Sequence, residues 1–305
     1  RPRPPERESG AMGFDWIALA EYSAIGVLSG GLLALIALGF VLIYKGTGVI
    51  NFAMGEFMML GAYFVFTAHV LWKLPLPVAL GLALAAVALC AALVERVVLR
   101  PLAGQPVISV LMATIGLGSV LHGGVDAIWG GQNHEMPQLL PRTPLLLGEV
   151  MIPGHIVWSF VLAALIIGAF TLVFRFTRTG ISMRAAASDP ITAYVLGIDV
   201  RATQRLTWMF AGMVGAVAGI VVASTTSLSP ALGGAALGVL AVIILGGLDS
   251  IAGAIVAGLI VGLVESLTAA YLGGKVRDIV PYATVLVILL VRPYGLFGTR
   301  QIERL

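Results

Sequence analysis

Long apolar runs separated by short polar connections dominate this chain. A helix needs roughly 20 residues to cross the hydrocarbon core of a bilayer, so most of these runs predict transmembrane helices. The runs fall at about 22–43, 52–72, 76–95, 107–128, 155–176, 206–226, 235–247, 251–271 and 279–292. The run at 235–247 is too short to cross as a straight helix and fits either a span or a re-entrant segment. We therefore expect an all-α polytopic membrane protein with about eight transmembrane helices plus this short segment.

Composition agrees with a bilayer environment. Charged residues make up only 11% of the chain, whereas a soluble domain carries about 25%. Hydrophobic residues reach 59%, and the runs are continuous rather than alternating, which excludes a β-barrel. The single cysteine, Cys90, excludes an internal disulfide and a cysteine-based zinc site. The net charge of +3 comes from basic residues in short loops and gives no indication of nucleic-acid binding.

Basic residues predict the orientation. With the N-terminal side outside, 11 Lys and Arg lie inside and four lie outside, apart from three at the start of the chain. The two long connections then fall outside (129–154) and inside (177–205). We expect a single transmembrane domain at 22–298 between an N-terminal tail, 1–21, and a cytoplasmic tail, 299–305. Met12 is a candidate start, so the native status of residues 1–11 is open.

Two glycines, Gly46 and Gly48, interrupt the helical pattern after the first run. They favour unwinding of the helix, and Asn51 is a suitable N-cap for the next one. Glu56 then falls in the first or second turn, near the positive end of that helix. A carboxylate within a span is costly and typically marks a pathway, a partner or a switch. A cytoplasmic turn whose Glu56 faces headgroup water is an equally good interpretation.

The inside loop 177–205 predicts two short helices. We expect the first at 182–187, a break at Asp189-Pro190 and a second helix that ends at Gly197, because Pro favours the first turn and Gly the position past the end. Small alanines would let a partner's groove close over the first helix, while Arg184 and Asp189 supply orienting charge. A docking element for another protein is therefore expected, in preference to a plain connection between spans.

Small and polar residues within the spans give further expectations. Four pairs with small-xxx-small spacing predict close helix contacts, namely Gly26/Gly30, Gly215/Gly219, Gly234/Gly238 and Gly258/Gly262. Glu265 could line a cavity or pair with a neighbouring helix. His122 and Asp126, four residues apart, could form a metal pair but are expected to reach water. Glu95-Arg96 and Arg100-Pro101 predict anchors at the inner interface.

Several common catalytic motifs are absent from the sequence. There is no G-x-x-x-x-G-K-[ST] phosphate loop, so ATP binding by this chain is not expected. The sequence has no H-E-x-x-H, G-x-S-x-G or Cys/His cluster, which disfavours a membrane enzyme. We expect no cofactor and no metal site in this chain.

Residues 48–63, GVINFAMGEFMMLGAY, resemble the signature of LivH-type permeases of bacterial ABC importers for branched-chain amino acids. Met54 stands where this family often has His. The similarity covers nearly the whole chain from Ala24 onward. It continues through Glu95-Arg96, Arg100-Pro101-Leu102, and the segments 178–198, 245–254 and 292–298.

The resemblance implies one of two permease subunits, paired with a LivM-like homologue, in the bacterial inner membrane. Two ATP-binding cassette subunits would bind ATP and Mg and dock on the 177–205 loop, while a periplasmic binding protein would deliver the substrate. The expected translocation-pathway residues are Gly48, Asn51 and Glu56. The expected ATPase-coupling residues are Arg184, Ala187, Ser188, Asp189, Leu196 and Gly197.

The substrate stays open between a branched-chain amino acid, urea, a short amide and an aromatic acid, as does pairing with a second copy of the chain. The alternative function is a stand-alone secondary transporter or channel for small solutes. It would need ion-coupling residues within the membrane, for which Glu56 and Glu265 are the candidates. It would also leave the Ala-rich inside loop unexplained.

Overall fold

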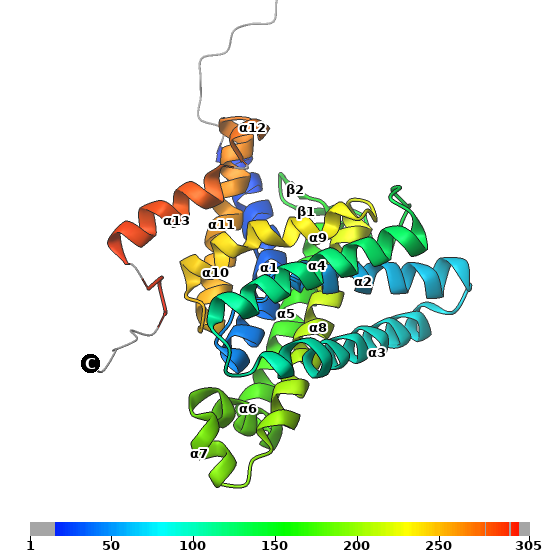
Figure 1. Cartoon of the computed structure of the whole chain (residues 1–305). Coiled ribbons are helices and arrows are strands. Elements are labelled where there is room, and N and C mark those ends of the chain that lie inside the picture. Colours follow the sequence, from blue (N-terminus) through cyan, green and yellow to red (C-terminus); the bar gives the residue numbers. More distant parts are fainter. Residues whose placement is uncertain (1–15, 278, 293, 299–305) are drawn as a thin grey trace, which may run out of the picture.

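The computed structural model describes residues 16–277, 279–292 and 294–298. Nearly every element in these residues is a helix, which confirms the predicted all-α fold (Figure 1). The predicted tail 299–305 and the first 15 residues of the predicted tail 1–21 lie outside the described residues. Residues 16–21 belong to the first helix, because their apolar pattern continues that of the first run.

Seven helices of the described part are long and apolar enough to cross a bilayer. They are α1 (Trp16–Thr47), α2 with its continuation (Met54–Leu71), α3 with its continuation (Leu76–Leu102), α4 (Val107–Trp129), α5 (Gly154–Phe176), α8 (Val200–Thr225) and α11 (Ile251–Tyr271). The last predicted run forms α13 (Val280–Val291), which has 12 residues. A straight crossing takes roughly 20, so α13 is not a full-length eighth span.

Short elements fill the connections. π-Helical turns extend α2 (Met54–Val65) and α3 (Leu76–Val94), at Phe66–Leu71 and Glu95–Leu99, and a 3-10 turn follows at Arg100–Leu102. The other helices are α6 (Arg178–Ser188), α7 (Pro190–Val195), α9 (Ala231–Ala235), a 3-10 turn (Ala236–Val239), α10 (Leu240–Gly246) and α12 (Gly274–Arg277). The outer connection holds a hairpin of β1 (Leu145–Leu147) and β2 (Val150–Ile152), paired antiparallel. Its three-residue strands are too short to be predicted from an alternating pattern.

α1 is the central helix of the bundle. Its residues 34–43 are all buried, as expected for a helix that is apolar on every side. α1 and α11 pack backbone to backbone, because Gly26 and Gly30 face Gly258 and Gly262. This contact confirms two of the predicted glycine pairs. By contrast, a Cβ built at Gly234 or Gly238 would meet no described atom within 4 Å apart from its own neighbouring backbone, so that pair makes no close contact with another helix.

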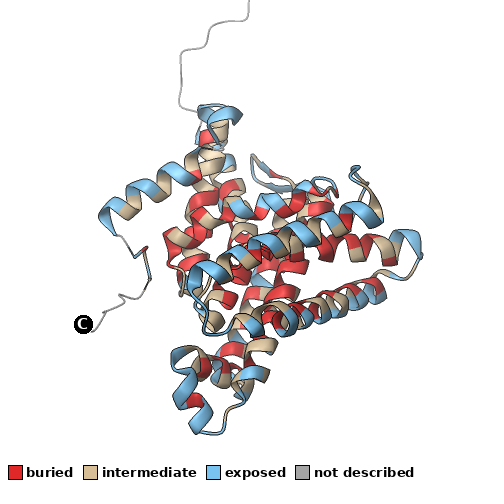
Figure 2. Ribbon diagram, in the orientation of Figure 1, coloured by how far each residue is buried: buried red, intermediate tan, exposed pale blue. Residues whose placement is uncertain are grey.

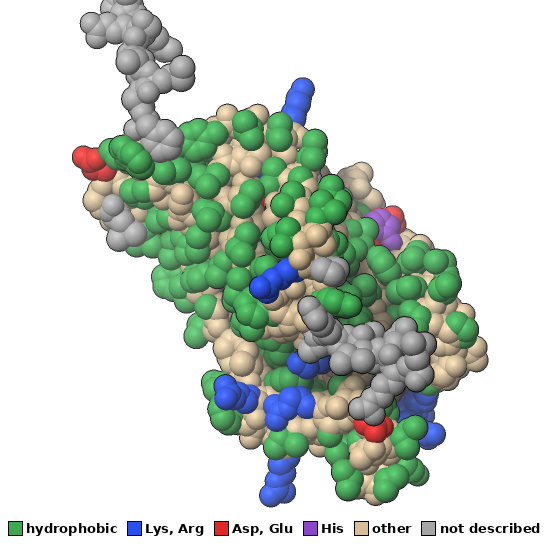
Figure 3. All heavy atoms as spheres, turned by 90° about the vertical axis from the view of Figure 1, so that its left-hand side faces the viewer, with side chains coloured by type: hydrophobic (Ala, Val, Ile, Leu, Met, Phe, Trp, Pro, Cys, Tyr) green, Lys and Arg blue, Asp and Glu red, His purple; other side chains and the backbone are tan. Residues whose placement is uncertain are grey.

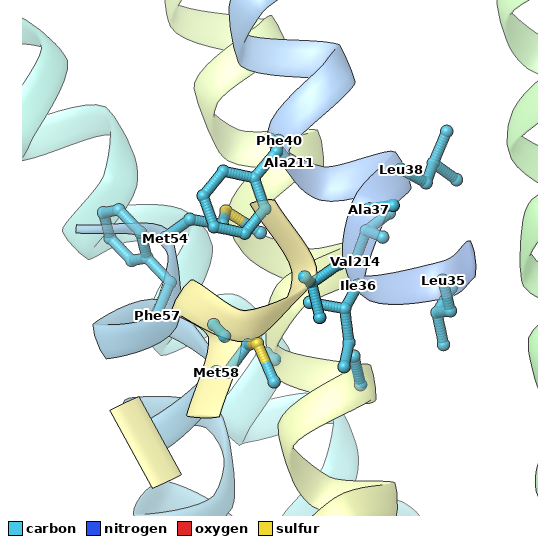
Figure 4. Packing of buried hydrophobic residues seen from close by; sticks show 14 of the residues in the cluster. Leu35, Ile36, Ala37, Leu38, Phe40, Met54, Phe57, Met58, Ala211 and Val214 are labelled. Carbon is cyan, nitrogen blue, oxygen red and sulfur yellow. The ribbon is translucent and has the colours of Figure 1, made fainter. Parts of the chain in front are cut away.

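Met54 of α2 fills the space between α1 and α8, and Met58 packs against α8 (Figure 4). Both side chains are fully buried, and glycines on the neighbouring helices make room for them. Met is unbranched and flexible, so it fits such irregular gaps. Met54 therefore has a packing role in this chain. It belongs to the buried core, which Figure 2 shows as the red ribbon in the middle of the molecule.

The segment 231–246 connects the two ends of the bundle. α8 starts beside α7 and leads away from it, and the loop after α8 pairs with the outer connection through a backbone bridge between Leu228 and His134. The segment then returns to Asp249, which lies within electrostatic reach of Lys45 and close to the α6 end. It therefore runs from one end to the other as a broken helix. In Figure 3 most visible Lys and Arg side chains lie in the lower half, on the predicted inner side.

Candidate functional site

The connection between α1 and α2 is a non-helical stretch inside the bundle. α1 ends at Thr47, and Gly48 takes a φ of 72°, which breaks the helix as predicted. Asn51 is 1% exposed. Its Oδ1 accepts a hydrogen bond from the Ala53 amide at 3.0 Å. Backbone without helical hydrogen bonds is tolerated at membrane depth only where protein buries it or a cavity adjoins it.

Asn51 is not the N-cap of α2, contrary to the prediction. Ala53 occupies that position, and no described side chain caps it. The Asn51 side chain instead closes a turn two residues earlier, the local hydrogen bond that Asn favours outside helices. The amide of Phe52 donates to Thr114 Oγ1 of α4 at 3.3 Å, which fixes the break against that helix.

Glu56 lies in the first turn of α2, as predicted, and its side chain is only 13% exposed. Its Oε2 lies 3.5 Å from His122 Nδ1, and His122 Nε2 lies 3.8 Å from Asp126 Oδ2. A Cβ at Gly233 would come within 2.6 Å of Glu56 Oε1, so a larger residue there would displace the carboxylate from this position. His122 thus joins two carboxylates. Among the described residues, no group of three His, Cys, Asp or Glu side chains could hold a metal ion.

A cavity of about 520 Å³ adjoins the inner side of the break. Its walls are residues 47–50, the inner end of α3, the start of α4 and the first turns of α8. Gly48 lines it, whereas Asn51 and Glu56 do not. Of the predicted inner anchors, Arg96 is exposed, but Glu95 is 3% exposed and lines this cavity. The clue in the sequence was a Glu at the end of an apolar run with an Arg five residues later.

The inside loop forms a helical hairpin made of α6 and α7. Thr177 Oγ1 accepts a hydrogen bond from the Gly180 amide at 3.1 Å and caps α6, so this helix starts four residues earlier than predicted. Arg184 Nη1 donates to the carbonyl of Phe174 at 2.5 Å, and its guanidinium lies 5.5 Å from the Phe174 ring centre. Arg184 therefore fastens α6 to the end of α5.

Asp189 separates the two helices, as predicted, and caps α7. Its Oδ1 accepts hydrogen bonds from the amides of Ile191 and Thr192 at 3.0 and 3.1 Å, and its Oδ2 accepts one from Thr192 Oγ1 at 2.5 Å. These bonds, that of the Thr192 hydroxyl first, hold the pKa of the Asp189 carboxyl below its ordinary value. The hairpin ends at Gly197, whose φ is 85°.

The exposed surface of α7 is apolar. Ile191, Tyr194, Val195 and Leu196 are each at least 74% exposed. α7 itself lies at the lower end of the molecule in Figures 1 and 2. Of these four, only Leu196 was among the predicted coupling residues. The predicted Ala187 and Ser188 lie at the α6 end of the same hairpin, half-buried and exposed respectively. α7 has only six residues, too few for a helical period in the sequence to indicate the other three.

Glu265 lies near the opposite end of the bundle. Its Oε2 is 3.5 Å from Arg277 Nη2 in the next helical element. Of the two sequence-based expectations for this residue, pairing with a neighbouring helix is the one observed.

Comparison with known proteins identifies the family. The profile described as branched-chain amino acid transport system / permease component matches residues 23–289. The high-affinity branched-chain amino acid transport system permease protein LivH of Escherichia coli K12 is 30% identical over 296 residues, which cover 92% of this chain and 95% of LivH. BraD of Pseudomonas aeruginosa is 30% identical over the same shares of both chains.

Further matches come from another organism and from a solved structure. A probable branched-chain amino acid transport permease protein LivH of Methanocaldococcus jannaschii is 30% identical over 92% of this chain and 93% of its own length. Among solved structures, PsaBC from Streptococcus pneumoniae in complex with Fab aligns over 90% of this chain and 92% of that chain, with a TM-score of 0.48 and 11% identity. The full-length sequence matches and the helical membrane fold agree: this chain belongs to the family of permease components of branched-chain amino acid transport systems.

Proposed function

We propose that this chain is a permease subunit of an ATP-driven ABC importer in the bacterial inner membrane. Its substrate would be a branched-chain amino acid or a related small molecule. The observation that carries this proposal is a family match along residues 23–289 combined with seven apolar helices of spanning length. The chain itself would supply part of the translocation path and no catalytic group.

ATP and Mg would bind to two partner ATPases, since this sequence has no phosphate loop. The α6–α7 hairpin is the proposed ATPase-docking element. Four large apolar side chains exposed on a water-facing loop are unusual and favour a protein partner. Arg184 and Asp189 would act indirectly, because their hydrogen bonds hold the hairpin rigid and attached to α5. A rigid hairpin can transmit a push from the ATPase to the spans.

The break at residues 48–53 is the proposed moving part of the pathway. Gly48, Asn51 and Glu56 lie at or beside non-helical backbone that contacts α4 and adjoins the inner cavity. Broken helices near the middle of a membrane are typical of transporters, because their backbone can change conformation around a substrate. A LivM-like permease and a periplasmic binding protein would complete the importer.

Co-expression with the partner permease, the ATPases and the binding protein would test this proposal. We expect a stable complex in nanodiscs whose ATPase activity is stimulated by one substrate among leucine, urea and an aromatic acid. A chain that never assembles with ATPases, yet takes up solute alone in liposomes, would overturn the importer. That result would favour the stand-alone carrier, which the Glu265–Arg277 pair disfavours because it already occupies one of the two candidate coupling carboxylates.

A further inference from the structure

The inner cavity beside the helix break has the size of a small-molecule site. Its volume of about 520 Å³ falls within the roughly 300–1,000 Å³ that is usual for such sites. Three separate helices and the break itself form its walls. It therefore adjoins the segment proposed to move during transport.

Glu95 is a buried carboxylate in this cavity without an adequate partner. Its side chain is 4% exposed, and its Oε1 lies 3.8 Å from Arg100 Nε, beyond hydrogen-bond distance. Neither Glu95 Oε2 nor Arg100 Nε has a hydrogen-bond partner among the described residues. A buried carboxylate normally accepts hydrogen bonds from close donors, and Glu95 lacks such a donor. The π-helical turn that starts at Glu95 is a second sign, since such turns are frequent at functional sites.

Cationic and apolar side chains complete the lining. Arg100 is about one-third exposed, and Arg201 of α8 is exposed. Arg201, Gln204 and Trp208 follow one another at helical spacing on one face of α8. Guanidinium groups bind carboxylates well because their donors match both oxygens. Leu99 and Trp208 supply the apolar part of the wall.

We propose that this cavity binds an apolar α-amino acid as a zwitterion. Its ammonium group would donate to Glu95, its carboxylate would accept from Arg100 and Arg201, and its side chain would lie against Leu99 and Trp208. The inference rests on the proposed function and deepens it, because it gives the substrate a holding site on the inner side before release. A phosphatidylethanolamine head group also carries one positive and one negative charge, so the test distinguishes an amino acid from this lipid.

The test measures binding to the complete transporter in nanodiscs of phosphatidylcholine and phosphatidylglycerol, without the binding protein. Three probes separate the charges: leucine, 4-methylpentanoate, which lacks the ammonium group, and isopentylamine, which lacks the carboxylate. Glu95→Gln and Arg201→Gln are the informative variants. Glu149→Gln, at the exposed turn of the outer hairpin, is the matched carboxyl-to-amide control.

We expect Glu95→Gln to weaken leucine and isopentylamine binding by about tenfold or more and to leave 4-methylpentanoate unchanged. Arg201→Gln should weaken leucine and 4-methylpentanoate and leave isopentylamine unchanged. Opposite selectivity of the two variants cannot come from misfolding, which would weaken all three probes alike. The control should bind every probe as the parent does.

Two results would overturn the inference. One is leucine binding that is absent from the parent or equal in the parent and Glu95→Gln. The other is phosphatidylethanolamine retained by the parent in native mass spectrometry, lost in Glu95→Gln and not displaced by leucine. Uptake by the complete transporter separates failure of this inference from failure of the proposed function. If the parent and Glu95→Gln take up leucine equally, the cavity site is wrong and the importer stands. If the parent takes up neither leucine, urea nor an aromatic acid, the proposed function is wrong.

Discussion

Replacing Gly30 by alanine should separate α1 from α11. A Cβ at Gly30 would lie 2.5 Å from the Gly258 carbonyl oxygen and 2.7 Å from Leu259 Cα. These neighbours are backbone atoms of α11, so no side chain can rotate away. Ordinary contact distances are about 3.5–4.0 Å, and the helices must therefore move apart by roughly 1 Å. Overpacking of this kind costs about 1–3 kcal/mol.

Thermal unfolding of the purified chain in detergent measures this cost. We expect Gly30→Ala to lower the Tm by roughly 2–12 °C, taking the change of about 2–4 °C per kcal/mol that holds for chains of about 150–250 residues. Gly168→Ala in α5 is the control, because a Cβ there would meet no described atom within 4 Å apart from the backbone of its own helix. Alanine at an open helical position stabilises by about 0.5–1 kcal/mol, so the control should melt at the same temperature or slightly higher.

The comparison has a clear refuting result. If Gly30→Ala and Gly168→Ala melt at the same temperature, the backbone contact between α1 and α11 does not exist in the folded protein. A double variant gives a further check. Gly30→Ala combined with Gly258→Ala should cost less than the sum of the two single changes, because the first separation already makes room for the second methyl group.

Three further predictions concern the inner side. Tyr194→Ser with Leu196→Ser should weaken ATPase binding by about tenfold or more, as truncation of interface anchors does; unchanged affinity in a surface-immobilised binding assay would contradict the docking role. Hydrogen bonds, that of the Thr192 hydroxyl first, lower the pKa of the Asp189 carboxyl. Its ionised cap therefore stabilises α7 fully at any pH above the ordinary carboxyl pKa. This stabilisation is lost as the pH falls through the lowered pKa of Asp189. Hydrogen exchange of the α7 amides should therefore lose protection only in that acidic range, and Asp189→Ala should remove the pH dependence. Gly48→Ala should cost about 1–2 kcal/mol in the left-handed conformation, and Gly48→Asn should recover part of the Tm; equal Tm values for all three chains would exclude the break.

The sequence predicted well the class of fold, the helix break at Gly48 and the two-helix form of the inside loop. Apolar runs locate the spans because each spanning helix must by itself be long and apolar enough to cross the hydrocarbon core. The break at Gly48 and the turn at Asp189-Pro190 were also predictable, since Gly and Pro act on their own backbone. All of these signals are local.

The parts that sequence reasoning missed depend on distant contacts. Asn51 could not be recognised as a turn residue, because its alternative role as a cap uses the same side-chain oxygen. Burial of Glu95 depends on α8, more than 100 residues later in the chain. The pairing of Glu56 with His122 likewise joins two helices that the sequence alone cannot bring together. Charges within spans indicated candidate sites, but not the residues that pair with them.

The contact between α1 and α11 also sets an order of events during synthesis. α1 is the first described span to leave the ribosome, and its glycine-rich surface has its partner more than 200 residues later. During most of translation this surface can contact only lipid, other spans or the insertion machinery. The central helix therefore becomes fixed near the end of synthesis, when α11 enters the membrane. A chain truncated before α11 should insert its early spans normally, yet be recognised by quality-control proteases as an unfinished bundle.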